Sequence, residues 1–171
     1  MQVKNGDLFQ NIPQDSDIVV IPHVCNDIGG WGRGFVLAVE KHFPEAKLSY
    51  KSLIGTEFLK LGHTDFAVGL EVVVPQLEIE KQVIIANMIA QHDVVMKVID
   101  GQKTPPIRYD ALEKCMQEVA MFCKNHISAG KNLQILCPMF GAGLAGGDWQ
   151  KISKMIETIW DKIPVTVFVY E

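Results

Sequence analysis

Short apolar runs alternate with polar or glycine-rich stretches along this chain. Two of the runs, Ile18–His23 and Val83–Ala90, are apolar almost throughout and have the length of buried β-strands. The stretch Phe66–Val74 predicts two strands separated by a bend at Gly69, which places one hairpin in the middle of the chain. Three further runs also predict strands: Met1–Lys4, Leu133–Cys137 and Val165–Tyr170.

Apolar residues at helical spacing lie between the predicted strands. They predict four helices: Arg33–His42, Pro44–Leu59, Tyr109–Ala129 and Asp148–Lys162. The irregular stretch Gln91–Pro106 is expected to be a loop that could cover a site as a lid. This alternation predicts an α/β fold with one domain over residues 1–171, a three-layer α/β/α sandwich with a central mixed β-sheet.

Composition and charge limit the classes of protein to which this chain can belong. Hydrophobic residues make up 48% of the 171 residues and charged residues 21%, as in ordinary soluble proteins. No apolar run approaches the roughly 20 residues of a membrane span, and the first residues lack the apolar core of a signal peptide. We therefore expect a cytoplasmic protein whose four cysteines, which lack disulfide or metal-ligand spacing, are buried free thiols. The net charge of -4 argues against general nucleic-acid binding but allows a small anionic ligand.

Two glycine-rich loops follow predicted strands and precede predicted helices. The first lies within Pro22–Gly34, and the second is Gly141–Gly147. Backbone N–H groups in such loops bind phosphate, so we expect the two loops to form one site for a phosphate-bearing ligand. The alternative is that the glycines serve only tight turns and packing.

The second loop contains a G-x-G-x-x-G pattern, the fingerprint of dinucleotide-binding folds. Its glycines are Gly141, Gly143 and Gly146. Only one further strand follows it, and Pro138 lies where the preceding strand enters the loop. Both features argue against an NAD-dependent dehydrogenase, although the phosphate-binding property of the motif remains.

Four side chains of the first loop carry candidate chemistry. His23 could transfer a proton or hold a phosphate oxygen, or could be a structural histidine of the core. Asn26 has the donors and acceptors that suit ribose hydroxyls. Trp31 is either a wall for a sugar or a packed aromatic residue, and Arg33 either contacts phosphate or is solvated at the start of its helix.

The sequence resembles a macro domain, the α/β/α module that binds ADP-ribose. The resemblance covers nearly the whole chain and lies in four segments: Gly6–Leu8, His23–Gly34, Ile107–Leu112 and Gly141–Trp149. The pattern His-x-Cys-Asn followed by Gly-x-Trp-Gly-x-Gly is similar to the branch of ADP-ribose 1''-phosphate phosphatases. It is also similar to related hydrolases that remove ADP-ribose from modified glutamates.

The resemblance implies roles for individual residues. Asp7 would accept a hydrogen bond from the adenine amino group, with the Leu8 backbone beside it, and Asn26 would bind the distal ribose. His23 would be the catalytic candidate and Asp148 a second one. Residues of the two loops would surround the diphosphate and distal ribose: Gly30, Trp31, Gly32, Arg33, Gly34, Gly141, Ala142, Gly143, Leu144, Ala145 and Gly146.

The implied function is hydrolysis at the distal ribose C1'' of an ADP-ribose derivative, with ADP-ribose 1''-phosphate as the expected substrate. The alternatives are a non-catalytic reader of ADP-ribose and a hydrolase that removes ADP-ribose from modified proteins. One glutamate-deconjugating subgroup uses a lysine after the central strand and an acid after Gly-x-Gly-Leu. Here those places hold Ala90–Asp93 and Ala145, which argues against the lysine-dependent mechanism. Asp148, directly before Trp149, either replaces the acid or serves only as the N-cap of its helix. No cofactor or metal is expected, because the other histidines have no pairing spacing.

Overall fold

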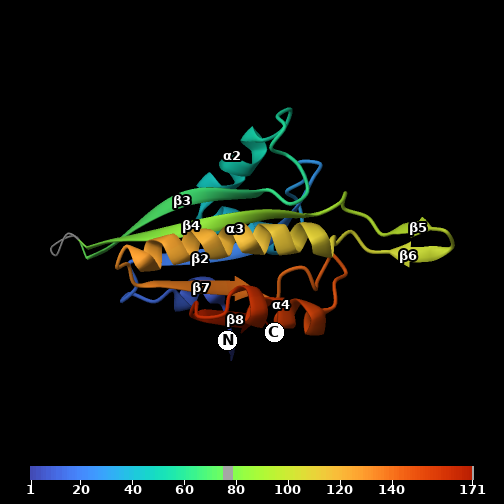
Figure 1. The fold of residues 1–171 in the computed structure, drawn as a ribbon. Coiled ribbons are helices and arrows are strands. Elements are labelled where there is room, and N and C mark those ends of the chain that lie inside the picture. The colour runs from blue at the N-terminus through green and yellow to red at the C-terminus, as the bar shows by residue number, and fades with distance from the viewer. Residues whose placement is uncertain (75–78, 171) are drawn as a thin grey trace.

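A six-stranded mixed sheet forms the middle layer of the computed structural model (Figure 1). The structure describes residues 1–74 and 79–170, with side chains for 1–69 and 81–170. The sheet has the order β1-β8-β7-β2-β4-β3, and only the β3–β4 pair is antiparallel. The strands are β1 (Gln2–Asn5), β2 (Ile18–Asn26), β3 (Thr64–Val74), β4 (Ile79–Gln91), β7 (Leu133–Pro138) and β8 (Val165–Val169).

Helices cover both faces of the sheet, which confirms the predicted sandwich. One face packs against the 3₁₀ helix η1 (Leu8–Asn11), α1 (Phe35–His42) and α2 (Pro44–Ser52), and the other against α3 (Tyr109–Ser128) and α4 (Trp149–Ile159). Two apolar cores result, because strand residues point alternately to the two faces. All four cysteines are buried with free thiols, as expected. None of the helices in the described ranges is long and apolar enough to cross a bilayer.

The strand order brings the two glycine loops together. Strands β2 and β7 are parallel neighbours, so their carboxyl ends lie at the same edge of the sheet. The chain after β2 leads to α1 on one face, whereas the chain after β7 leads to α4 on the other. Such a reversal opens a crevice at the carboxyl ends of the strands, the place where open α/β sheets bind ligands.

The predicted bend at Gly69 is wrong, because β3 runs unbroken from Thr64 to Val74. The glycine has a packing role instead: a Cβ at this position would lie 2.7 Å from Cδ1 of the Phe43 ring. The antiparallel pair of the sheet is therefore formed by β3 and β4. Glycine at this position lets an aromatic side chain lie directly on the strand backbone.

Two predicted helix boundaries are also wrong. Helix α1 begins at Phe35, not Arg33, because Gly34 is its N-cap with a φ of 81° and a ψ of -149°. Helix α2 ends at Ser52, not at Leu59, and Gly55 beyond it has a φ of 80°. Two of the apolar residues that suggested the longer helix, Ile54 and Phe58, are about half exposed. Left-handed backbone stops a helix whatever its apolar pattern.

The stretch predicted as a loop forms a small hairpin, β5 (Lys97–Ile99) paired with β6 (Gln102–Thr104). Asp100 and Gly101 join the strands, with φ values of 51° and 76°. An Asp-Gly pair with both residues at positive φ is a strong hairpin signal, so the sequence did contain the information. Figure 1 shows the hairpin extending away from the sheet at the carboxyl end of β4.

Candidate functional site

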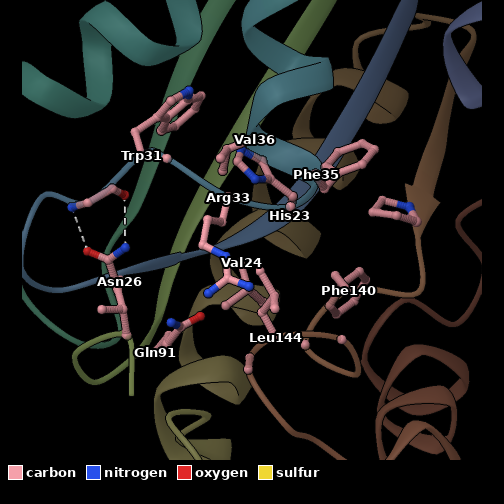
Figure 2. A pocket seen from close by; sticks show the side chains of 18 of the residues that line it. His23, Val24, Asn26, Trp31, Arg33, Phe35, Val36, Gln91, Phe140 and Leu144 are labelled. Carbon is pink, nitrogen blue, oxygen red and sulfur yellow. Dashed lines mark hydrogen bonds between the residues drawn. The ribbon is translucent and has the colours of Figure 1, made fainter. Parts of the chain in front are cut away.

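A pocket of about 590 Å³ lies between the two glycine loops (Figure 2). This volume falls in the range of small-molecule sites. Most of the residues predicted for the site line it: His23, Asn26, Gly30, Trp31, Gly32, Arg33, Gly34, Gly141, Gly143, Leu144 and Ala145. The pairing of β2 with β7 thus joins two segments that lie more than a hundred positions apart in the sequence.

Five predicted residues do not line this pocket: Asp7, Leu8, Ala142, Gly146 and Asp148. Asp7 caps η1 by accepting a hydrogen bond from the Phe9 N–H at 2.9 Å. Asp148 caps α4 in the same way, accepting from the Gln150 N–H at 2.9 Å. Both carboxylates therefore have local structural roles, and the structure does not place Asp148 with His23 in the pocket lining.

Sequence reasoning missed part of the lining: Val24, Phe35, Val36, Gln91, Val94, Pro138, Met139 and Phe140. Gln91 and Val94 enter because β4 ends beside β2, and both belong to the stretch that the sequence predicts as a loop able to cover a site. The others directly follow or precede the glycine loops. Their position in the sequence could have indicated them, since residues at the carboxyl ends of adjacent parallel strands lie at one edge of the sheet.

Asn26 holds the first glycine loop in shape. Its amide donates to the Gly30 carbonyl at 2.8 Å, and its Oδ1 accepts from the Gly30 N–H at 2.8 Å and the Ile28 N–H at 3.2 Å. The Tyr50 hydroxyl also lies 2.9 Å from this Oδ1. The acceptor is therefore fully used, and one amide N–H is left for a ligand.

The last turn of α2 supports the same loop. The Tyr50 hydroxyl donates to Asn26, lying 2.6 Å from its backbone carbonyl oxygen. The ammonium group of the next residue, Lys51, donates to the Gly29 carbonyl. Burial raises the pKa of Tyr50 above its ordinary value, so the hydroxyl keeps its proton and remains a donor. The loop conformation thus depends on a helix that lies outside the pocket.

Changing Tyr50 to phenylalanine is expected to destabilise the protein by about 1–2 kcal/mol, because the Asn26 carbonyl and Oδ1 lose their buried donor. The ring itself stays, so packing against Trp31 is kept. Urea unfolding measures the loss. The control is Tyr170→Phe, at a residue that is 81% exposed. Equal stability of the two variants would show that the hydroxyl does not support the loop.

The two loops meet over the pocket. A Cβ at Gly34 in the first loop would lie 3.1 Å from Cδ1 of Leu144 in the second. The second loop is held by backbone hydrogen bonds from Gly146 N–H to the Gly143 carbonyl at 3.0 Å and from Ile107 N–H to the Ala145 carbonyl at 3.0 Å. Gly34 also needs its positive φ to begin α1.

Two glycines in the lining are not required by the fold. Gly32 and Gly143 have no left-handed φ, and a Cβ at either would have no atom within 4 Å. They lie in different loops and line the same pocket. Glycine at such places leaves backbone open to a close approach by a ligand. This observation favours ligand binding over the interpretation that glycines serve only tight turns.

Charge in the pocket is positive. Arg33 lines it, and within the described ranges its guanidinium has no hydrogen-bond or ion-pair partner. Figure 2 shows this side chain reaching toward Gln91. No aspartate or glutamate belongs to the lining as far as the structure describes it. The N-terminus of α1 also faces the pocket, since Gly34, Phe35 and Val36 line it. Free N–H groups and the helix dipole favour an anion there.

His23 is a buried wall residue, 2% exposed. Its Nε2 lies 2.6 Å from Oδ1 of Asn87, and its ring makes an edge contact with Trp31 at a centroid distance of 5.6 Å. Burial lowers the pKa of His23 to about 4, although the hydrogen bond to Asn87 acts in the opposite direction. The imidazole is therefore neutral at pH 7.

Trp31 is both a packed aromatic residue and part of the pocket lining. It is 7% exposed and packs on Tyr50 as well as on His23. Its indole Nε1 is buried and has no hydrogen-bond partner in the described structure. The structure thus shows Trp31 as a packed aromatic residue, and its role as a wall for a sugar stays a prediction.

Comparison with known proteins gives three informative relatives, while no family model matches the chain. A Bacteroides thetaiotaomicron protein of unknown function has 36% identity and a TM-score of 0.79, covering 98% of this chain and 96% of that one. The ADP-ribose 1''-phosphate phosphatase of Candida albicans is 23% identical over 177 residues, 99% of each chain. A macrodomain protein from Streptomyces coelicolor has 31% identity and a TM-score of 0.64, covering 98% of both chains.

The fold, the two glycine loops and this last likeness agree with the family that the sequence motifs indicated. The match to the Streptomyces coelicolor protein extends over nearly all of both chains and is not confined to the loops. This chain belongs to the macrodomain family.

Proposed function

We propose that this protein binds ADP-ribose in the pocket between the glycine loops. The observation that carries the proposal is the pocket itself. It is lined by open glycine backbone from both loops, by the start of α1 and by Arg33, with no carboxylate among the described lining residues. A ligand with a diphosphate matches this combination, because backbone N–H groups and a guanidinium neutralise phosphate charge. The family relationship supports the same ligand.

The N-termini of α1 and α4 differ in how freely their backbone N–H groups can bind an anion. The Asp148 carboxylate already occupies the N-terminus of α4, whereas Gly34 caps α1 without a side chain. The phosphates are therefore assigned to α1 and Arg33, not to the helix after the second loop. In this proposal the second loop supplies the opposite wall through Gly141, Gly143 and Leu144.

Calorimetric titration with ADP-ribose tests the proposal, with AMP and ribose 5-phosphate as fragment controls. We expect binding of micromolar strength, about -8 kcal/mol, and much weaker binding of either fragment. A site that spans the whole ligand gives this result, because each fragment leaves part of the pocket empty. No binding of ADP-ribose at millimolar concentration would refute the proposed function.

Changing Arg33 to glutamine is expected to weaken ADP-ribose binding about tenfold, the effect of losing one charge-assisted hydrogen bond at an exposed site. The matched control is Lys41→Gln, which removes one positive charge from the last turn of α1, the helix that follows Arg33. Titrations at low and high salt separate the two variants, since only the Arg33 variant should lose the salt dependence of binding. Equal affinities would remove Arg33 from the site.

A second candidate function is hydrolysis of ADP-ribose 1''-phosphate to ADP-ribose and inorganic phosphate. The name of the Candida albicans relative, matched along 99% of both chains, favours it. His23 is the ionisable group besides Arg33 in the described lining. We assign no step to Asp148, which lies outside that lining.

A phosphate-release assay on ADP-ribose 1''-phosphate separates the two functions. We expect release by the wild type and a lower kcat for His23→Gln, with ADP-ribose affinity measured in parallel. Turnover unchanged by this substitution would refute a catalytic role for His23. Strong ADP-ribose binding without any phosphate release would select a reader, and release of ADP-ribose from a modified protein would select a deconjugating hydrolase.

A further inference from the structure

A line of polar side chains runs from the pocket wall across the sheet. His23 on β2, Asn87 on β4 and Asp65 on β3 are direct neighbours in strand register. Nε2 of His23 lies 2.6 Å from Oδ1 of Asn87, and the Asn87 amide nitrogen lies 3.0 Å from Oδ2 of Asp65. The Ser49 hydroxyl of α2 donates to the other Asp65 oxygen at 2.8 Å. The pocket wall is thus connected to the edge strand and to α2.

The acceptors around Asn87 determine which way its amide points. Its nitrogen faces the Asp65 carboxylate and, at 3.1 Å, the backbone carbonyl of Ala46. Both partners accept hydrogen bonds and neither donates, so they require the NH₂ group on their side. The amide oxygen must then face His23. Because Asn87 is 0% exposed, the reverse orientation would leave buried polar groups without partners.

The orientation of Asn87 in turn determines the state of the histidine. An oxygen acceptor opposite Nε2 requires a proton on Nε2, and a neutral imidazole then has a lone pair on Nδ1. The Cys25 thiol lies beside the ring, with its sulfur 3.9 Å from Nδ1 and 3.9 Å from Nε2. A thiol is a weak donor, so this contact is compatible with an unprotonated Nδ1.

We propose that Asn87 and Asp65 are positioning residues of the pocket, which hold the His23 ring in place and keep its proton on Nε2. His23 then faces a ligand as a neutral hydrogen-bond acceptor. It has no proton to give to a leaving group at the distal ribose, and that proton comes from solvent. The consequence for turnover rests on the proposed function, whereas the state of His23 is a property of the free protein.

The groups that face His23 support a neutral ring. Cys25 lies beside it on β2, Asn87 on β4, Trp31 in the first loop and Phe35 on α1. The carboxylate of Asp65 is one residue further away, behind Asn87. None of the four direct neighbours is charged, since burial raises the pKa of the Cys25 thiol well above its ordinary value. Burial of the ring itself therefore favours the neutral form.

Nitrogen-15 NMR of the imidazole groups tests the proposal on the free protein, without ligand. For the wild type we expect a protonated Nε2 and an unprotonated Nδ1 at His23, unchanged from pH 5.5 to pH 8. The substitution Asp65→Asn replaces a pure acceptor by an amide that can also donate. It is therefore expected to let the Asn87 amide turn and to populate the Nδ1–H tautomer of His23. Asp65 is partly exposed, which favours folding of this variant.

The control is Ser52→Ala on the exposed side of α2, which removes a hydroxyl that, among the described residues, bonds only the Ser49 carbonyl. It should keep the wild-type spectrum, and Asp65→Glu should restore the Nε2–H tautomer. A wild-type His23 that carries its proton on Nδ1, or that titrates between pH 5.5 and 8, would overturn the proposal. So would an Asp65→Asn spectrum identical to that of the control.

Titration with ADP-ribose then measures the effect on the pocket. We expect Asp65→Asn to weaken binding by up to about tenfold relative to Ser52→Ala, because a His23 that carries its proton on Nδ1 cannot accept a hydrogen bond from the ligand there. Equal affinities of these two variants would overturn the positioning role at the ligand. If the wild type does not bind ADP-ribose at all, the proposed function fails, while the NMR result on His23 stands or falls separately.

Discussion

Replacing Gly147 by alanine is expected to destabilise the folded protein by roughly 2–4 kcal/mol. A Cβ at this position would lie 2.5 Å from the carbonyl oxygen of Gly141, a distance that real Cβ atoms do not tolerate. The oxygen has little freedom to move, because it accepts the hydrogen bond from the Gly147 N–H at 2.7 Å. The second loop must therefore open, and with it the wall of the pocket. Thermal unfolding measures the loss, expected as a fall in Tm of roughly 5–15 °C.

The same loop provides the matched control. In Gly143→Ala the new methyl group would have no neighbour within 4 Å, and φ is not left-handed. Its Tm should stay within about 2 °C of the wild type, since substitutions without contacts usually change stability by less than about 0.5 kcal/mol. If Gly147→Ala is as stable as Gly143→Ala, the contact with the Gly141 carbonyl does not determine the loop conformation.

The second large effect is a loss of stability in acid caused by His23. The pKa of this residue is lowered from 6.5 to about 4 by burial, so between these values the unfolded chain binds a proton that the folded chain does not. The stability that depends on a neutral His23 is therefore fully present above about pH 6.5 and is lost as the pH drops toward 4. At about 1.4 kcal/mol for each pH unit, the loss reaches roughly 3 kcal/mol near pH 4.

Urea unfolding at a series of pH values, on the wild type and on His23→Gln, isolates this contribution. Glutamine is neutral throughout, so the variant should lose less stability between pH 6.5 and 4 than the wild type. Carboxylates titrate in the same range, and comparing the two proteins removes their effect. The control His42→Gln, an exposed position on α1, should keep the wild-type slope. Parallel curves for wild type and His23→Gln would show that His23 titrates normally in the folded protein.

These two effects have different origins in the chain. The strain at Gly147 comes from a neighbour six positions away, so it is a property of one loop. The pKa of His23 depends on residues from several elements, among them Asn87 on β4 and Trp31 in the first loop. The sequence could therefore indicate that Gly147 is important, because it belongs to a glycine cluster. It could not indicate the protonation state of His23.

The order of strands, loops and helices was largely predictable because it depends on local periodicity. The apolar run at Ile18 and the helical spacing after Gly34 correctly predicted β2 and α1 to within a few residues. The bend predicted at Gly69 was wrong because this glycine has a tertiary role under the Phe43 ring. Periodicity shows which residues face a core, but it does not show which distant side chain lies against a given backbone position.

The candidate site, like the fold, was predictable from the sequence only in part. By itself the sequence determined that two glycine loops follow buried strands, and that His23, Asn26 and Arg33 lie beside them. Only the tertiary structure decided how each side chain is used. The β2–β7 pairing brings the loops together, Asn26 and Asp148 are engaged in local hydrogen bonds, and Arg33 stays free of partners within the described residues. Burial and the hydrogen-bond partners of a group depend on segments distant in sequence, and they determine its charge and its remaining capacity to bind.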